Sequence, residues 1–249
     1  MKDSGLVVVL GATSAIAQAY ARRRAAAGAR FVLAGRREER LNVVAADLLA
    51  RGAASAEPLK MDLSASGEIE RAVETIHARF GPPQEIVVAY GILGEQAAFE
   101  RDLAAARAAL EVNFTSVALW LLAFLKRRDA VQPLTAIVIG SVAGDRGRRT
   151  NFIYGAAKGG LDIFVQGLAH AYAGTPVRFV MVKPGFVDTP MTAAFVKGGP
   201  LWSSPDRVAA DIERAVRRGA RVVYTPWFWR PIMAVIRRLP WFVFRRLKI

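Results

Sequence analysis

The apolar run from Leu6 to Leu10 constrains the fold most, because a turn that begins with glycine and a helical stretch follow it directly. Five consecutive apolar residues are typical of a strand that is buried on both faces of a parallel sheet. The turn begins at Gly11, and residues 15–27 have the pattern of a helix that is stopped by Gly28. A strand, a tight turn and a helix in this order predict the first unit of an α/β protein.

The alternation of strands and helices continues along the chain. Further strands are expected at 30–34, 57–61, 85–89, 135–140, 177–182 and 222–224, and helices at 38–51, 69–80, 103–126, 151–172 and from 204 onward. Strands that alternate with helices predict a parallel sheet covered on both faces. We therefore expect a single Rossmann-type α/β domain, a doubly wound parallel sheet, over residues 1–224. Residues 225–249 are expected to form a separate basic, aromatic C-terminal tail.

The composition narrows the chemistry. The 249 residues include no cysteine, which excludes disulfides, thiolate catalysis and cysteine-based zinc sites, and no metal site is expected. The N-terminal apolar run is too short for a signal peptide. No apolar stretch is expected to reach the ~18 residues of a spanning helix. The longest one, 114–125, is expected to be a buried helix, and together these features predict a cytoplasmic protein.

Positive charge is concentrated at the C-terminal end of the chain. The formal net charge is +14, and the segment from Arg214 onward holds ten Arg and Lys residues and no Asp or Glu, which leaves +4 on the rest. Such an asymmetry indicates a local anionic partner, either a membrane surface or nucleic acid. No RNA-binding motif accompanies the basic segment, so we favour the membrane surface and expect no nucleic acid.

The turn at 11–17 consists mainly of small residues. Such a turn lets the backbone approach a pyrophosphate, and the helix that follows adds free N–H groups and partial positive charge. The alternative is a tight strand-to-helix turn that binds nothing. The second strand is followed by Arg36 and Arg37, where an acidic residue would accept hydrogen bonds from a ribose. Arginines at this position favour a 2′-phosphate, and therefore NADPH over NADH.

Tyr154 and Lys158 lie four residues apart in a predicted helix and therefore on one face of it. A nearby ammonium lowers the pKa of a phenol, so Tyr154 is expected to donate a proton near neutral pH. Ser141 follows an apolar strand, at the sheet edge where ligands of open α/β sheets bind. The Tyr–Lys spacing alone also fits an ordinary amphipathic helix. Its combination with Ser141 favours a catalytic site.

With Asn113 included, these residues have the order and spacing of the catalytic set of the short-chain dehydrogenase/reductase family, which the chain resembles over residues 5–190. The resemblance implies reduction of a keto group with hydride from NAD(P)H. Ser141 and Tyr154 would hydrogen-bond the substrate carbonyl, with Tyr154 as the acid. Lys158 would tune Tyr154 and hold the ribose, and Asn113 would position a water for proton relay.

The same resemblance implies a cofactor site, and its members are Gly11, Thr13, Ser14, Ala15, Ile16, Arg36, Arg37, Asp62, Leu63, Ala89, Tyr90, Gly91, Tyr154, Lys158, Pro184, Gly185, Val187 and Thr189. The chain departs from the family pattern at two places. In the turn, Leu10 stands for threonine, and Ala15 and Ala17 stand for the second and third glycines. After the fourth strand, Ala89-Tyr90-Gly91 stands for Asn-Ala-Gly.

Two further segments bear on the substrate. Arg146, Arg148 and Arg149 lie between Ser141 and Tyr154, and they are expected to bind a phosphate of the substrate. The alternative for these arginines is a solvated loop.

The C-terminal tail combines seven aromatic residues, from Tyr224 onward, with basic pairs. This pattern predicts an interfacial membrane element. Pro231 and Pro240 are expected to break it into short helices, with Arg237 and Arg238 at the end of one. The alternatives are a helix packed on the domain or on a second subunit of a homo-oligomer.

Within the family, the chain resembles the decaprenylphosphoryl-2-keto-β-D-erythro-pentofuranose reductases at 89–93, 141–149, 154–162 and in its aromatic, arginine-rich C-terminus. This resemblance implies a keto-sugar substrate linked to polyprenyl phosphate, a partner oxidase, and a peripheral position on the inner membrane face. The resemblance to that group implies NADH, whereas Arg36 and Arg37 favour NADPH, so the choice between the two cofactors stays open. The alternatives are a reductase of a soluble or fatty keto substrate, such as a 3-oxoacyl thioester, and a non-catalytic nucleotide-sensing scaffold.

Overall fold

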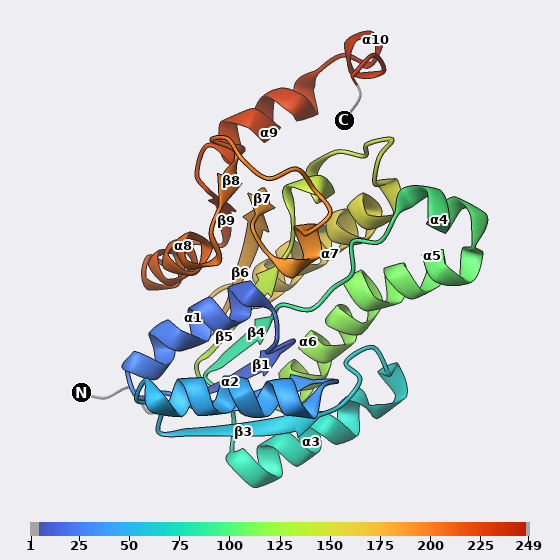
Figure 1. The fold of residues 1–249 in the computed structure, drawn as a ribbon. Helices are drawn as coiled ribbons and strands as arrows, with labels where there is room; N and C mark the ends of the chain where they lie inside the picture. The colour runs from blue at the N-terminus through green and yellow to red at the C-terminus, as the bar shows by residue number, and fades with distance from the viewer. Residues whose placement is uncertain (1–4, 248–249) are drawn as a thin grey trace.

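Seven parallel strands form one sheet in the order β3-β2-β1-β4-β5-β6-β9 (Figure 1). The computed structural model describes residues 5–247. The strands are β1 (Leu6–Leu10), β2 (Arg30–Gly35), β3 (Ser55–Lys60), β4 (Glu85–Val88), β5 (Leu134–Ile139), β6 (Val177–Pro184) and β9 (Val222–Thr225). The order reverses between β1 and β4, and the crevice at such a reversal is where open α/β sheets bind ligands. The predicted doubly wound parallel sheet is therefore confirmed.

The first strand lies in the middle of the sheet. β1 pairs with β2 on one side and with β4 on the other, and all five of its side chains are buried. An apolar side chain is needed at every position because each face of the strand is covered. Its unbroken apolar run thus follows from its central place.

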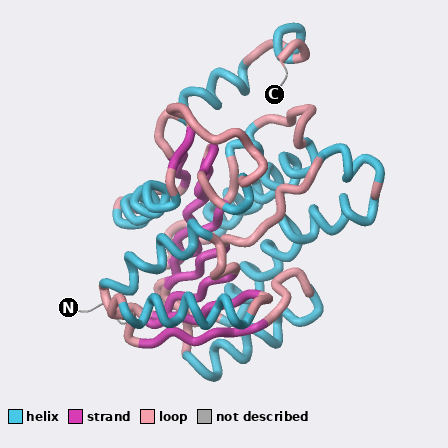
Figure 2. The backbone as a smooth tube through the Cα atoms, viewed as in Figure 1, coloured by secondary structure: helices cyan, strands magenta, loops and turns pink. Residues whose placement is uncertain are grey.

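Helices cover both faces of the sheet (Figure 2). One face carries α1 (Ala15–Ala26), α2 (Glu38–Ala50) and α8 (Pro205–Arg217), and the other carries α3 (Ile69–Phe80), α6 (Ser116–Arg127) and α7 (Phe152–Ala171). Each layer closes a separate hydrophobic cluster against the sheet. The carboxyl ends of the strands remain available for a site, because the helices leave that edge free.

The predicted helix at 103–126 is interrupted. α5 (Leu103–Leu110) continues into a π-helical turn, η2 (Glu111–Thr115), and then into α6; the short α4 (Gln96–Arg101) precedes it. By length and composition the stretch Leu103–Arg127 could cross a membrane, so the expectation that no apolar stretch is long enough was wrong. More than half of its most apolar 18-residue window is buried, and Trp120 and Phe124 stack within the core. It is therefore a core helix of this domain.

Short elements join the carboxyl ends of the strands. They are the 3₁₀ turns η1 (Ser66–Glu68), η3 (Val142–Asp145) and η4 (Pro190–Thr192), and the two-stranded ribbon of β7 (Phe186–Val187) and β8 (Trp202–Ser203). None of them shows a periodic sequence pattern, and none was predicted from the sequence.

The first half of the C-terminal segment is part of the domain. The boundary expected after residue 224 falls inside β9, where Thr225 donates a hydrogen bond to Asp211 of α8 (2.8 Å). α9 (Trp229–Arg238) buries Trp229 and Met233 against Val142, and α10 (Trp241–Phe244) follows it. The helices extend beyond the carboxyl edge of the sheet (Figure 1). Lys248, one of the tail's basic residues, lies outside the described residues.

The two prolines of this segment differ in effect. Pro240 separates α9 from α10, as predicted. Pro231 does not break a helix, which corrects that expectation: it lies in the first turn of α9, where a missing N–H costs nothing because no acceptor precedes it. α9 ends at Arg238, as expected of the basic pair.

The packing of α9 gives a stability test. Met233 is 0% exposed and Val235, two residues on in the same helix, is 62% exposed. Met233→Ala should lower the free energy of unfolding by about 2–5 kcal/mol, because it leaves a cavity beneath the helix. Val235→Ala should change it by less than about 0.5 kcal/mol. Urea unfolding of both variants checks this, and equal small effects would mean that α9 is not packed on the domain.

Candidate active site

A cleft of about 520 Å³ lies at the carboxyl edge of the sheet, around the ends of β1, β2, β4, β5 and β6. All the residues assigned to the cofactor and catalytic sets from the sequence line this one cleft. The loop residue Arg148 also lines it, whereas Arg146 and Arg149 do not. Strand ends far apart in the sequence therefore supply one site, as expected of a parallel sheet.

The turn that begins at Gly11 lets a ligand approach the backbone closely. Gly11 has a φ of +88°, and a Cβ there would lie 2.7 Å from the backbone nitrogen of Tyr90. Only glycine fits this conformation and spacing. α1 begins at Ala15, and Ser14 provides no side-chain cap, so its first N–H groups have no side-chain acceptor from that position. The turn thus offers a helix N-terminus to an anion despite its alanines.

Three exposed arginines border the cleft after β2. Arg36, Arg37 and Arg40 all line it, and none forms an ion pair among residues 5–247. Arg40 was missed from sequence; its signal is its place in the first turn of the helix that follows Arg36 and Arg37. Three unpaired guanidinium groups at one end of the cleft favour an anionic ligand there.

Asp62 and Leu63 form the next part of the lining. Asp62 accepts hydrogen bonds from the backbone nitrogen (2.9 Å) and the hydroxyl (2.7 Å) of Ser64, which lower the pKa of its carboxyl. The charge of Arg36 lowers it further. The carbonyl of Leu63 accepts a hydrogen bond from the indole nitrogen of Trp120 (2.9 Å), which fixes this segment to α6.

Tyr90 replaces the family's alanine and reaches into the core. Its hydroxyl lies 3.0 Å from the hydroxyl of Ser116, which in turn donates to the carbonyl of Glu111 (2.9 Å). Burial raises the pKa of Tyr90 well above its usual value. The phenol therefore serves as a neutral hydrogen-bonding group that links the end of β4 to the π-helical turn.

Asn113 lies in that π-helical turn and is fully buried. Its side-chain nitrogen donates to the carbonyls of Ile92 and Ala109 (both 2.8 Å), and its oxygen accepts from the backbone nitrogen of Ile92 (3.1 Å). A Cβ on Gly91 would lie 2.6 Å from that oxygen. The turn is a π-bulge of the kind often found at functional sites, and periodicity alone does not reveal it.

Tyr154, Lys158 and Ser141 meet at the centre of the cleft. The Lys158 ammonium lies 5.9 Å from the centroid of the Tyr154 ring and donates to the carbonyl of Ile139 (2.9 Å). Burial lowers the pKa of Lys158 to about 8. The hydroxyl of Ser141 accepts from the backbone nitrogen of Ala143 (3.1 Å), which turns it toward the Tyr154 phenol.

The pKa of Tyr154 differs from the sequence-based expectation. Burial raises it to about 12, and the hydrogen bond with Ser141 lowers it only in part. The expected lowering by Lys158 was wrong, because desolvation of the buried phenol sets the direction of the shift and only Ser141 opposes it. Tyr154 is therefore protonated throughout the neutral range and can serve as a proton donor.

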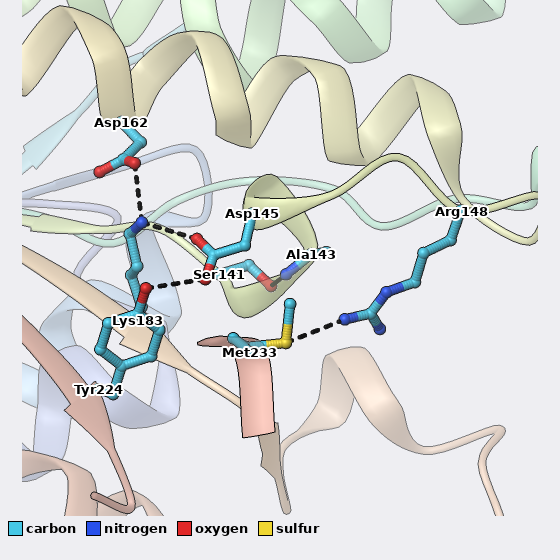
Figure 3. Close-up of polar contacts among 8 residues, drawn as sticks. All are labelled: Ser141, Ala143, Asp145, Arg148, Asp162, Lys183, Tyr224 and Met233. Atoms are coloured by element: carbon cyan, nitrogen blue, oxygen red, sulfur yellow. Dashed lines mark hydrogen bonds and ion pairs between the residues drawn. The ribbon is translucent and has the colours of Figure 1, made fainter. Parts of the chain in front are cut away.

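A buried ion-pair cluster holds these elements in place (Figure 3). The ammonium of Lys183, at the end of β6, donates to Asp145 of η3 and to Asp162 of α7 (both 2.7 Å). The phenol of Tyr224, on β9, donates to the other oxygen of Asp145 (2.8 Å). The two hydrogen bonds to the carboxylates raise the pKa of Lys183 despite its burial. The cluster thus fixes the turn after Ser141 against the helix that carries Tyr154.

The three loop arginines do not act together, which corrects the prediction of a joint phosphate site. Arg146 donates to the carbonyls of Ile236 and Leu239 (2.8 Å to the latter), and its guanidinium stacks 3.7 Å from the centroid of Phe244. Arg149 donates to the carbonyl of Arg245 (2.8 Å). Both are used to hold the C-terminal segment, because the ends of its helices leave carbonyls without partners.

The C-terminal segment also supplies part of the cleft, which was not predicted from the sequence. Trp229 lines it and packs so closely on Gly185 that a Cβ there would overlap the indole. Phe186 stacks on Trp202 (5.4 Å between centroids) and meets Trp229 edge to face (5.6 Å). No local pattern pairs these residues, because they meet only through the tertiary fold.

The geometry fits a dinucleotide and no metal cluster. The glycine turn and arginines suit its phosphates, and the ends of β4 and β6 line the opposite half beside Tyr154. Within residues 5–247, no group of three or more His, Asp or Glu side chains could hold a metal ion.

Comparison with known proteins shows similarity along the chain. The family described as short chain dehydrogenase matches residues 5–198. A protein of Mycobacterium tuberculosis (strain ATCC 25618 / H37Rv), called an uncharacterized oxidoreductase, is 41% identical over 252 residues and covers 99% of each chain. An uncharacterized oxidoreductase of Streptomyces coelicolor is 39% identical over 246 residues, covering 98% of this chain and 96% of its own.

Two solved structures have the same fold. A short chain dehydrogenase/reductase from Burkholderia phymatum in complex with NAD has a TM-score of 0.82 at 20% identity, covering 94% of this chain and 92% of that one. A variant of actinorhodin polyketide ketoreductase with NADPH has a TM-score of 0.77 at 25% identity, covering 90% of this chain and 96% of that one.

The pKa values at the centre of the cleft give a pH prediction for keto-group reduction. Lys158, with a pKa near 8, loses its positive charge above that pH, whereas Tyr154 keeps its proton until about pH 12. The kcat/KM for a ketone should therefore be level below about pH 8 and fall above it. In Lys158→Met the rate should be lower and the fall near pH 8 absent. A fall that persists in this variant would assign the titration to another group.

Proposed function

This chain belongs to the short-chain dehydrogenase family and is an NAD(P)-dependent oxidoreductase, and from that premise we propose that it reduces a keto group with Tyr154 as the proton donor. The observation that carries the proposal is the meeting of Ser141, Tyr154 and Lys158 in a cleft that also holds the glycine turn. The scaffold hypothesis is not favoured, because a protein that only sensed a nucleotide would not need a buried, protonated phenol there.

The residues of the cleft account for the chemistry. Bound NAD(P)H supplies the hydride. Ser141 and Tyr154 hydrogen-bond the keto oxygen and orient it, and Tyr154 passes its phenolic proton to that oxygen as negative charge develops there. The positive charge of Lys158 then stabilises the phenolate. Asn113 holds the β4 end and the π-helical turn in place, and the water we assign to it would return a proton to the site.

The arginine group favours NADPH. Arg36, Arg37 and Arg40 border the cleft beyond β2, and the strand is followed directly by arginines and not by an acidic residue that would accept from a ribose hydroxyl. Guanidinium groups bind phosphate through paired, charge-assisted hydrogen bonds. A 2′-phosphate would therefore bind more favourably than a hydroxyl at this end of the cleft.

For the substrate, we propose a keto-sugar linked to polyprenyl phosphate, converted from a 2-keto-pentofuranose to the arabinofuranose type. The resemblance at 89–93, 141–149 and 154–162 supports it. The C-terminal segment supports it independently, since Trp227, Trp241 and Phe242 are 61–70% exposed beside basic residues. Such a surface would bring the cleft to an anionic bilayer, on the inner membrane face, where a lipid-linked substrate resides.

A second candidate is a fatty or polyketide-like keto substrate. The likeness to a polyketide ketoreductase at 25% identity favours it, since that enzyme shares most of this chain's fold. Reduction of a soluble 3-oxoacyl thioester with equal efficiency in the absence of membranes would decide for this candidate.

The assigned acid gives the direct test of the activity. Tyr154→Phe should bind NADPH as the unmodified protein does and lose at least ~10²-fold in ketone turnover, the lower range for a positioned general acid. NADPH oxidation with a panel of ketones and cofactor binding by fluorescence measure the two quantities. In the unmodified protein, NADPH should bind more tightly than NADH. Near-normal turnover in Tyr154→Phe would contradict the assignment of Tyr154 as the proton donor.

The membrane proposal has its own test. The full chain should sediment with vesicles of anionic phospholipid and be partly released by high salt. Trp241→Ala combined with Phe242→Ala should weaken this binding and leave NADPH binding unchanged. Val131→Ala, which removes an exposed apolar side chain elsewhere, is the control. Unchanged sedimentation of the double variant would contradict the proposal.

A further inference from the structure

Arg148 differs from the other arginines of its loop. Arg146 and Arg149 donate to carbonyls of the C-terminal segment, whereas the contact recorded for Arg148 is with the thioether of Met233 (3.4 Å), a weak acceptor. Figure 3 shows its guanidinium extended toward α9, below the turn that follows Ser141. Arg148 also lines the cleft.

The charge of Arg148 is not neutralised by a neighbour. No carboxylate lies within ion-pair distance of it among residues 5–247. Asp145, whose charge acts on it, already accepts from Lys183 and from Tyr224. Burial lowers the pKa of Arg148, so the guanidinium is partly desolvated without a compensating partner. Such a group is costly unless a ligand binds it.

Unpaired polar atoms belong to three residues that line the cleft. Six buried side-chain atoms lack a partner in the described part of the chain, and three of them belong to cleft-lining residues: Arg148 Nε, Asn151 Oδ1 and Trp229 Nε1. Two of these three are N–H donors. Trp229 and Met233 are four residues apart in α9, so the indole and the thioether that Arg148 contacts lie on the same face of that helix.

From this geometry we propose that Arg148 binds an oxyanion of the keto substrate, a phosphate or a carboxylate, in the half of the cleft walled by α9. The inference rests on the proposed ketoreductase function and assigns its substrate class. The planar guanidinium donates two parallel hydrogen bonds to such a group, and the low exposure of the site strengthens them. Arg146 holds the end of α9, which forms this wall, and Arg148 meets the ligand.

The test compares charged and neutral ketones. Ribulose 5-phosphate and levulinate represent the phosphate and the carboxylate, and ribulose and 2-pentanone are their neutral counterparts. Arg148→Gln should raise KM for the preferred anionic ketone about 10- to 100-fold, the loss expected for charge-assisted hydrogen bonds, and change KM for the neutral ones less than about 3-fold. Arg148→Lys should recover part of the loss.

Arg149→Gln is the matched control, because it removes one positive charge from the same loop at a residue that does not line the cleft. It should leave the ratio of the anionic and neutral KM values unchanged. If the two KM values rise together in Arg148→Gln, the residue only shapes the loop, and the proposal fails. No change in either KM would also overturn it.

A second readout separates this proposal from the ketoreductase function. Calorimetry can follow ribulose 5-phosphate and levulinate binding to the NADP⁺-loaded protein, in which no hydride is available for transfer. Should the protein reduce none of the four ketones, the loss of this binding in Arg148→Gln but not in Arg149→Gln would still support an oxyanion site. Equal binding by the unmodified protein and Arg148→Gln would overturn it.

Discussion

The buried ammonium of Lys183 is the contact on which the site depends. It joins Asp145 of the turn after β5 to Asp162 of α7, and both bonds are 2.7 Å long. Ser141 lies just before Asp145 in the chain, and Tyr154 lies before Asp162 in the same helix. The ion pair therefore sets the relative position of the Ser141 and Tyr154 hydroxyls. A buried pair of this kind adds little net stability, but removing one partner leaves a charge without compensation. We infer that its value here is positional.

The same cluster reaches the C-terminal segment through Tyr224. From there α9 follows, with Trp229 lining the cleft. In the loop between Ser141 and Tyr154, Arg146 donates to carbonyls at the end of α9, and Arg149 donates to the carbonyl of Arg245 after α10. The segment from residue 225 onward, which the sequence suggests is an appended tail, therefore packs partly on the domain. Its first helix contributes Trp229 to the wall of the cleft, and several of its aromatic residues are exposed. The same segment therefore holds both the exposed surface proposed to bind a membrane and the part of the cleft wall proposed to contact the substrate.

The parallel sheet and the membership of the cleft could be predicted from the sequence, because the sequence patterns that indicate them are local. The buried run at 6–10 and the strand–helix alternation specify a parallel sheet, and the strands of such a sheet bring their carboxyl ends together. The residues of the cofactor and catalytic sets consequently line one cleft. What failed depends on tertiary contacts. The pKa of Tyr154 is set by burial, the π-helical turn around Asn113 by packing, and the partners of Arg146 and Arg149 by a segment some ninety residues further along the chain.

In the proposed reaction, hydride passes from the dinucleotide to a keto carbon while both are bound in this cleft. The direct measurement uses NADPH with deuterium at the transferable position of the nicotinamide, a keto-sugar phosphate as substrate, and mass spectrometry of the product. We expect one deuterium on the new carbinol carbon for each cofactor oxidised. Oxidation of NADPH without deuterium in the product would contradict the claim.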